Sequence, residues 1–221
     1  MREAVIVSTA RTPIGKAYRG AFNDTQAQAL AGHAIAEAVK RSGIENHEVD
    51  DVIVGAATQQ GTQGGNIARQ SLLRAGLPVT VAGMSLDRQC ASGLMAIATA
   101  AKEIIDDGMQ VTVGGGVESV SLTRNDNYRV DRARDPWFQN NLPSMYMTMI
   151  ETAENVAERY NITREVQDEY AYQSQMRTAA AKEMGLFDKE IVPMKSFMKT
   201  KNKETGLSSS IELKFKEDES N

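Results

Sequence analysis

The chain has 221 residues, enough for one large domain or for one domain with an appendage, and 41% of its residues are hydrophobic. The formal net charge of −4 and the lack of a basic patch give no electrostatic reason to expect nucleic acid or a membrane surface as a partner. A single cysteine excludes an internal disulfide framework, and the sequence has neither a bilayer-spanning apolar stretch nor a recognisable targeting peptide, so we expect a cytoplasmic protein.

The first elements predict a strand, a helix and a second strand. Residues 4–8 form a short apolar run, and the proline- and glycine-containing segment 11–15 follows it, which predicts a buried strand and a turn braced by Arg11. In residues 25–41, apolar residues and alanines recur at intervals of three and four, which is typical of a helix. Residues 51–57 predict a second buried strand. The order strand, helix, strand predicts parallel pairing.

The next segment, residues 59–66, is rich in glycine and precedes a predicted helix over residues 67–75. A glycine-rich loop at a helix N-terminus can hold a phosphate. This loop matches neither a Walker motif nor a dinucleotide fingerprint, so we favour tight-turn packing as its role.

Cys90 lies where a predicted strand, residues 79–86, turns into a helix that ends at residues 106–108. The residues after Cys90 are small at first and then apolar at helical spacing. A thiol at that point faces unpaired backbone N–H groups and the positive end of the helix dipole, both of which favour the reactive thiolate. Spacing alone leaves two roles open, a buried small side chain and a nucleophile.

The strand predicted over residues 110–113 leads into three glycines, 114–116, which allow one backbone to approach another closely. We expect this segment to form the floor of a pocket beside Cys90. Glu118 is open to two roles, a base or a carboxylate that anchors the next loop, and we favour the second.

After about residue 120 the sequence becomes more polar. Residues 123–137 predict an irregular, solvated loop. Three methionines that follow suit either a core plug or the lining of a site for a flexible ligand: Met145, Met147 and Met149.

Two helices are predicted next, over residues 151–160 and from Thr163, a capping residue, to residue 185. From Lys195 the chain is rich in lysine and polar residues, and we expect a mobile, solvated tail.

Several of these motifs resemble the thiolases, which are acyl-CoA acyltransferases. Cys90-Ala-Ser-Gly-Leu resembles the thiolase nucleophile loop, and residues 114–121, Gly-Gly-Gly-Val-Glu-Ser-Val-Ser, resemble a Gly-Gly-Met-Glu-Ser-Met-Ser segment of that family. The passage from residue 152 to residue 193 resembles the thiolase loop domain that covers coenzyme A. The resemblance covers nearly all of residues 1–193.

The resemblance implies an α/β thiolase-like fold: a mixed, mainly parallel sheet with helices on both faces and the Cys90 helix buried at its centre. It implies an N-terminal domain over residues 1–120, which carries the nucleophile, and an incomplete coenzyme A-covering region over residues 121–221. Cys90 is then the residue that forms the acyl thioester, and Met149 is a coenzyme A contact. Acyl-CoA thioesters are the implied substrates, the implied assembly is a homo-oligomer (dimer or tetramer), and no metal or redox cofactor is implied.

Thiolase chemistry also needs a base and a second acid/base group. The chain has only two histidines, His33 and His47, and we interpret both as structural or surface residues. In thiolases the activating histidine and a second cysteine belong to Gly-His-Pro and Cys-x-Gly motifs in a C-terminal half, and these motifs do not occur here. We therefore expect the chain to be inactive without that half.

One local departure from the family pattern is that Met149 is followed by Ile150 where many thiolases have glycine, and preceded by Thr148 where some have histidine. Two alternatives remain beside the thiolase interpretation. One is a condensing enzyme of the ketoacyl synthase type, and the other is a non-catalytic binding or assembly subunit with a thiolase-like fold.

Overall fold

The computed structural model describes residues 2–202 and 204–219. These residues form two compact units, one made of residues 2–128 together with 189–219 and the other of residues 129–188. The sequence had suggested a single boundary after residue 120. The structure instead brings the last segment of the chain back to the first unit.

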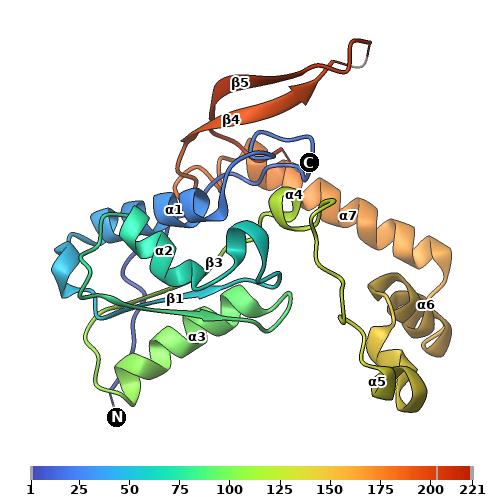
Figure 1. Ribbon diagram of the computed structural model, residues 1–221, viewed down its shortest axis with the longest axis horizontal. Helices are drawn as coiled ribbons and strands as arrows, with labels where there is room; N and C mark the ends of the chain where they lie inside the picture. The colour runs from blue at the N-terminus through green and yellow to red at the C-terminus, as the bar shows by residue number, and fades with distance from the viewer. Residues whose placement is uncertain (1, 203, 220–221) are drawn as a thin grey trace. The chain divides into compact units, whose positions relative to one another are not determined.

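The first unit is built on a parallel three-stranded sheet with the strand order β2-β1-β3 (Figure 1). Its strands are β1 (Asp51–Gly55), β2 (Ala82–Leu86) and β3 (Thr112–Gly116). In the central strand every residue is buried, as its run of Val and Ile predicts. Ile53 of β1 lies opposite Met84 of β2 and Gly114 of β3.

Helices cover both faces of this sheet, which confirms the α/β class expected from the sequence. Helices α1 (Ala27–Ser42) and α2 (Ile67–Arg74) lie on one face, and α3 (Ser92–Ile105) lies on the other (Figure 1). Val52 and Val54 of β1 pack in a core cluster with the first two helices, whereas Ile53 packs with Ala96 and Ala100 of α3. Alternate residues of one strand therefore form two cores, one on each face.

The prediction of a buried strand over residues 4–8 was wrong. This segment has no regular secondary structure and belongs to neither sheet, and Val5, Ile6 and Val7 are each more than 70% exposed. A strand needs a hydrogen-bonding neighbour, and within the described residues β1 pairs directly with β3 and β2. The predicted parallel pairing of this segment with residues 51–57 is therefore not seen.

Helix α3 is buried on one face only, which corrects the expectation of a fully buried helix. Ser92, Ala96, Ala100 and Glu103 are buried against the sheet. On the other face Leu94 is 72% exposed and Ile97 is 42% exposed.

Most of residues 194–215 form two strands, in contrast to the mobile tail that the lysines suggested. Strands β4 (Met194–Lys201) and β5 (Ser208–Phe215) form an antiparallel hairpin. Met194 and Ser196 are buried, the Ser196 hydroxyl donates to the Ala21 carbonyl at 2.9 Å, and the ring of Phe215 packs edge-on against Phe22 at 5.1 Å. The hairpin is thus held by the loop that follows Arg11. The part of the expected tail at residues 203 and 220–221 lies outside the described residues.

Short elements complete the first unit. They are η1 (Asn46–Glu48), η2 (Gly61–Gln63) and α4 (Val120–Thr123). In the glycine-rich loop, Gly61 and Gly65 adopt positive φ angles of 58° and 67°, which agrees with the tight-turn role favoured from the sequence.

The second unit consists of helices only. They are α5 (Pro136–Asn141), η3 (Pro143–Tyr146), α6 (Met149–Arg159) and α7 (Arg164–Glu183). The side chain of Thr163 accepts from the Val166 N–H group, so the predicted cap of α7 is confirmed. None of residues 129–188 is buried. Within the described residues, no helix has the length and apolar character that crossing a bilayer requires.

Candidate active site

Cys90 lies in the short turn that joins β2 to α3. The strand ends at Leu86, Ala91 is the N-cap residue, and the helix begins at Ser92. The Cys90 side chain is exposed. This is the strand-to-helix position expected from the sequence, and the exposure does not fit the alternative of a small buried side chain.

The turn is sharp because Gln89, the residue before the cysteine, has a φ angle of +50°. A left-handed conformation costs a residue with a Cβ atom roughly 1–2 kcal/mol, so other contacts have to stabilise it. The Ala91 N–H group donates to the Arg88 carbonyl at 3.1 Å, and the Ser92 N–H group donates to the Gln89 carbonyl at 3.0 Å. These two N–H groups therefore close the turn, whereas the sequence had suggested that they face the thiol unpaired.

The hydroxyl of Ser92 makes two further bonds within this turn. It accepts from the Arg88 N–H group at 2.8 Å and donates to the Gln89 carbonyl at 2.6 Å. The Gln89 N–H group donates to Oδ1 of Asp87 at 2.7 Å. Both peptide groups of Gln89 are thus fixed by neighbours. Ser92 itself is 3% exposed.

Glycines at the ends of β1 and β3 let the start of α3 come close to the sheet. An ideal Cβ atom on Gly55 would lie 2.2 Å from the carbonyl carbon and oxygen of Ser92. One on Gly116 would lie 2.9 Å from Cα of Gly93, and one on Gly114 would lie 2.8 Å from Cα of Ile97. The glycine run at the end of β3 therefore lies against the helix that follows the cysteine turn, and its role as the floor of a pocket beside Cys90 stays a prediction.

Glu118 anchors a loop, as favoured from the sequence. Its Oε2 accepts from the Ala57 N–H group at 2.9 Å, and its Oε1 accepts from the side-chain amide of Gln63 at 2.9 Å. Gln63 is fully buried, and its amide oxygen accepts from the Ser119 N–H group. The carboxylate ties the ends of β1 and β3 to the glycine-rich loop.

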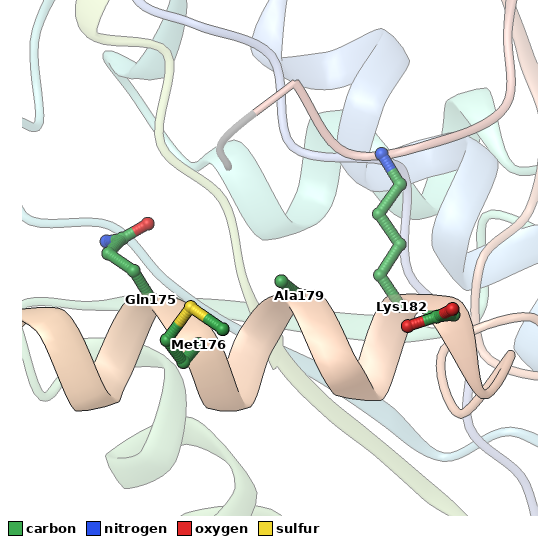
Figure 2. Close-up of a pocket in the computed structure, with 5 residues that line it drawn as sticks. Gln175, Met176, Ala179 and Lys182 are labelled. Atoms are coloured by element: carbon green, nitrogen blue, oxygen red, sulfur yellow. The ribbon is translucent and has the colours of Figure 1, made fainter.

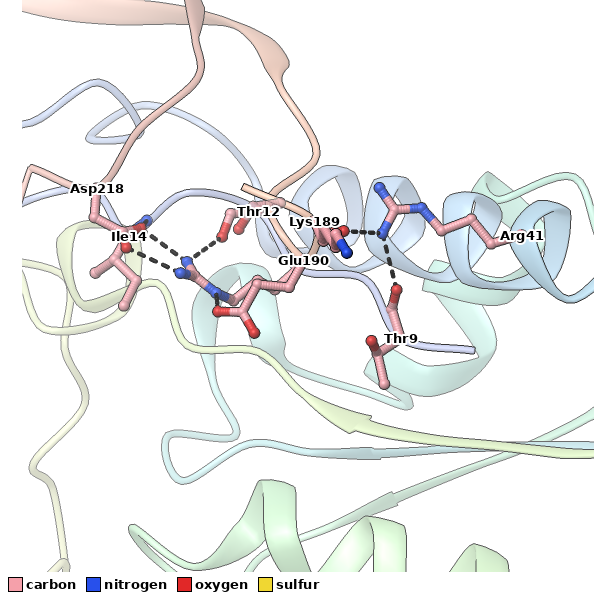
Figure 3. Close-up of polar contacts among 8 residues, drawn as sticks. Thr9, Thr12, Ile14, Arg41, Lys189, Glu190 and Asp218 are labelled. Carbon is pink, nitrogen blue, oxygen red and sulfur yellow. Dashed lines mark hydrogen bonds and ion pairs between the residues drawn. The ribbon is translucent and has the colours of Figure 1, made fainter. Parts of the chain in front are cut away.

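Arg11 braces its loop, as expected, through partners that the sequence analysis did not identify. Its Nε atom bonds to Oε1 of Glu190 at 2.7 Å, and its two terminal nitrogens bond to the two carboxylate oxygens of Asp218 at 2.8 and 3.0 Å (Figure 3). The carboxylate of Asp218, followed by that of Glu190, raises the pKa of this guanidinium above its ordinary value. Oδ1 of Asp218 also accepts from the Ile14 N–H group at 2.8 Å.

The two histidines agree with the structural and surface roles assigned to them. The Nε2 atom of His33 lies 3.2 Å from the Pro193 carbonyl oxygen, so this ring links α1 to the chain before the hairpin. His47 is exposed in η1.

Met149 is the first residue of α6 in the second unit, and its side chain is 72% exposed. Its proposed contact with coenzyme A stays a prediction. The departure from the family pattern beside it has a structural role, because the Thr148 hydroxyl accepts from the Glu151 N–H group and the Glu151 carboxylate accepts from the Thr148 N–H group. The bonds to Thr148 lower the pKa of Glu151.

Two hollows on the described surface lie elsewhere on the chain. A shallow depression of about 630 Å³ runs along α7 and is lined by Met176, Ala179 and neighbouring residues of that helix alone (Figure 2). A cavity of about 180 Å³ is lined by loop 12–17 and residues 118–121, with Phe22 and Leu30. Neither is lined by Cys90 or Met149.

Comparisons with known proteins agree on one family. The family model described as "Thiolase, N-terminal domain" matches residues 4–218. The chain is 39% identical to a 3-ketoacyl-CoA thiolase of Bacillus subtilis over 201 residues, which cover 88% of this chain and 49% of that protein. It is 39% identical to an acetyl-CoA acetyltransferase of Escherichia coli over 208 residues, which cover 88% of this chain and 52% of that protein.

Comparison with solved structures points to the same family. The crystal structure of the Bacillus anthracis acetyl-CoA acetyltransferase superposes with a TM-score of 0.78 at 38% identity, covering 99% of this chain and 55% of that chain. The chain thus spans about half the length of the curated relatives it matches.

Proposed function

Because this chain belongs to the thiolase family, we propose that it carries the acyl-accepting cysteine of an acyl-CoA acyltransferase, with Cys90 in that role. The observation that supports this proposal most directly is the position of Cys90: an exposed thiol on a hydrogen-bonded turn at the start of a helix. Reactive cysteines in proteins occupy such accessible positions, where the helix dipole favours negative charge. The named relatives, a 3-ketoacyl-CoA thiolase and an acetyl-CoA acetyltransferase, fit the same reaction class.

In the proposed first step, the Cys90 thiolate attacks the carbonyl carbon of an acyl-CoA thioester. The bond between that carbon and the coenzyme A sulfur breaks, and coenzyme A leaves as a thiolate that takes up a proton. The acyl group is then held on Cys90 as a new thioester. In the second step a base takes a proton from the thiol of another coenzyme A or from the α-carbon of a second acyl-CoA. The acyl group passes to that sulfur or carbon, the bond between the acyl carbon and the Cys90 sulfur breaks, and Cys90 is released as a thiolate.

The second step needs acid/base groups, which we propose come from a C-terminal thiolase domain. In this chain the His33 ring contacts the Pro193 carbonyl, and the Glu118 carboxylate accepts hydrogen bonds from Ala57 and Gln63. We infer that Cys90 acylation is slow without a partner base and that turnover requires the other half. Met149, at the exposed start of α6, remains our candidate for a coenzyme A contact.

The test measures acylation of the protein by intact-protein mass spectrometry. The chain is incubated with acetyl-CoA, both alone and fused to the C-terminal half of the Bacillus subtilis thiolase, and each form is compared with its Cys90→Ser variant. We expect the fusion to gain the mass of one acetyl group at Cys90, the chain alone to gain it slowly or not at all, and both variants to gain none.

Three results would change this conclusion. Acetylation that persists in Cys90→Ser would remove Cys90 from the reaction. A strong preference for carrier-protein thioesters over coenzyme A thioesters would indicate a condensing enzyme of the ketoacyl synthase type. A fusion in which both halves fold and associate, but in which Cys90 is never acylated, would indicate a non-catalytic assembly subunit.

A further inference from the structure

Ser92 spans the turn that presents the cysteine. Its hydroxyl lies between the backbone of the two residues before Cys90, since it accepts from the Arg88 N–H group at 2.8 Å and donates to the Gln89 carbonyl at 2.6 Å. The side chain of Ser92, two residues after the cysteine, therefore closes the turn on which Cys90 lies.

The residue held by these bonds is the one that needs support. Gln89 has a φ angle of +50°, and a residue with a Cβ atom does not keep a left-handed conformation without compensating contacts. Among the described residues, the Gln89 carbonyl accepts two hydrogen bonds from Ser92, one from its hydroxyl and one from its N–H group, and the Gln89 N–H group donates to Asp87.

The position of Ser92 is itself fixed by packing. The residue is 3% exposed, and Gly55 at the end of β1 lies against its carbonyl group. A buried residue whose backbone lies against a strand cannot easily move, so its hydroxyl holds the turn in a fixed position relative to the sheet.

We propose that Ser92 is a positioning residue for Cys90, which fixes the thiol for attack on an acyl thioester by holding Gln89 in its left-handed conformation. The catalytic meaning of this inference rests on the function proposed above, whereas the effect on thiol geometry can be measured without an acyl donor. Small displacements of a reacting group lower rates by large factors.

The experiment compares Ser92→Ala with Ser92→Thr, which keeps the hydroxyl, and with Ser71→Ala as a matched control. Ser71 is fully buried like Ser92, but its hydroxyl has no hydrogen-bond partner among the described residues. Two rates are measured over a range of pH: alkylation of Cys90 by iodoacetamide in the 221-residue chain, and acetylation by acetyl-CoA in the fusion described above. The fraction of folded protein is measured in parallel.

We expect Ser92→Ala to lower both rates about tenfold and to change the shape of the pH profile, while Ser92→Thr recovers most of the loss and Ser71→Ala has no effect. A defect in folding alone would change the rate at each pH only in proportion to the folded fraction measured at that pH. Equal rates in Ser92→Ala and Ser71→Ala would overturn the proposal, as would equal losses in Ser92→Ala and Ser92→Thr.

Two further outcomes separate this inference from the proposed function. If Cys90 is acetylated normally and Ser92→Ala has no effect, the positioning role fails and the acyltransferase proposal stands. If the alkylation rate falls in Ser92→Ala but Cys90 is never acetylated, the positioning role stands and the acyltransferase proposal fails. Should Ser92→Ala not fold, amide hydrogen exchange of the unmodified chain decides, because an Arg88 N–H group that exchanges as fast as an exposed amide is not bonded to the Ser92 hydroxyl.

Discussion

The backbone of Gly55 lies so close to that of Ser92 that a Cβ atom on the glycine would be 2.2 Å from the serine carbonyl group. This contact joins the end of the central strand to the first residue of the helix that follows Cys90. The position of the thiol therefore depends on a residue that lies more than thirty positions away in the sequence.

The first prediction is that Gly55→Ala displaces the start of α3. The added methyl group meets backbone atoms, which cannot rotate away, so we expect a loss of about 2 kcal/mol in the free energy of unfolding. Alkylation of Cys90 should slow in the protein that remains folded. Gly115→Ala is the matched control, because a Cβ atom there has nothing within 4 Å. Urea unfolding and the alkylation rate measure both effects, and equal stability of the two variants would contradict the prediction.

Local signals in the sequence predicted most of the helices. Helix α1 follows from apolar periodicity and from Gly43 at its end, which has a φ angle of 76°, and Thr163 was identified as a cap before α7. The strand-to-helix position of Cys90 follows from small residues before an apolar helical pattern. These features depend on neighbours within a few positions, which a sequence displays directly.

Features that depend on distant partners were not predicted. Residues 4–8 have the composition of a buried strand, but pairing is decided by other strands. The hairpin was interpreted as a solvated tail because of its lysines. Buried Met194 and Ser196 alternate with exposed Lys195 and Phe197, but the sequence does not display this period of two, because the buried serine is polar and the exposed phenylalanine is apolar. The left-handed conformation of Gln89 has no signal in the sequence, because glutamine rarely adopts it.

A second prediction concerns Asn66, the N-cap of α2. Its Oδ1 accepts from the Arg69 N–H group at 3.0 Å, and its Nδ2 donates to the Gly83 carbonyl at 2.6 Å, so one side chain caps a helix and links it to β2. Asn66→Ala should lower the free energy of unfolding by about 1–2 kcal/mol. Asn66→Asp keeps the oxygen that caps the helix but removes the amide N–H group that donates to Gly83. Its free energy of unfolding should therefore fall by less than that of Asn66→Ala. Denaturant unfolding of the three proteins checks this order, which the reverse ranking would refute.

A third prediction concerns the clamp formed by Arg11, Glu190 and Asp218. Lysine cannot reproduce the paired bonds of the guanidinium to Asp218, so Arg11→Lys should lower the free energy of unfolding by about 2 kcal/mol and loosen the chain around Asp218. The control is Arg164→Lys, whose pair with Asp168 on α7 is exposed and should contribute less than about 0.5 kcal/mol. Amide exchange near the Ile14 N–H group, which donates to Asp218, should rise only in Arg11→Lys.

The last prediction follows from two acids buried between α3 and β1. Glu103 is 8% exposed, its Oε2 atom has no hydrogen-bond partner among the described residues, and Asp51 is 9% exposed. Burial, followed by the charges of Asp51 and Asp107, raises the pKa of Glu103 above its ordinary 4.5. Burial, followed in the same direction by the charge of Asp50, raises the pKa of Asp51, and only its bond from the Val52 N–H group opposes this.

The sign of the pH dependence follows from these directions. Between the unfolded and folded pKa values the folded chain binds more protons than the unfolded chain, so stability falls as pH rises through that window. Glu103→Gln removes the charge and should be more stable than the parent by about 1 kcal/mol near pH 8, with the gain vanishing near pH 4. Glu154→Gln, at an exposed position on α6, removes the same charge and should show no such trend. Urea unfolding across this pH range measures the difference, and a gain in Glu103→Gln that stays constant with pH would show that the carboxylate is not the cause.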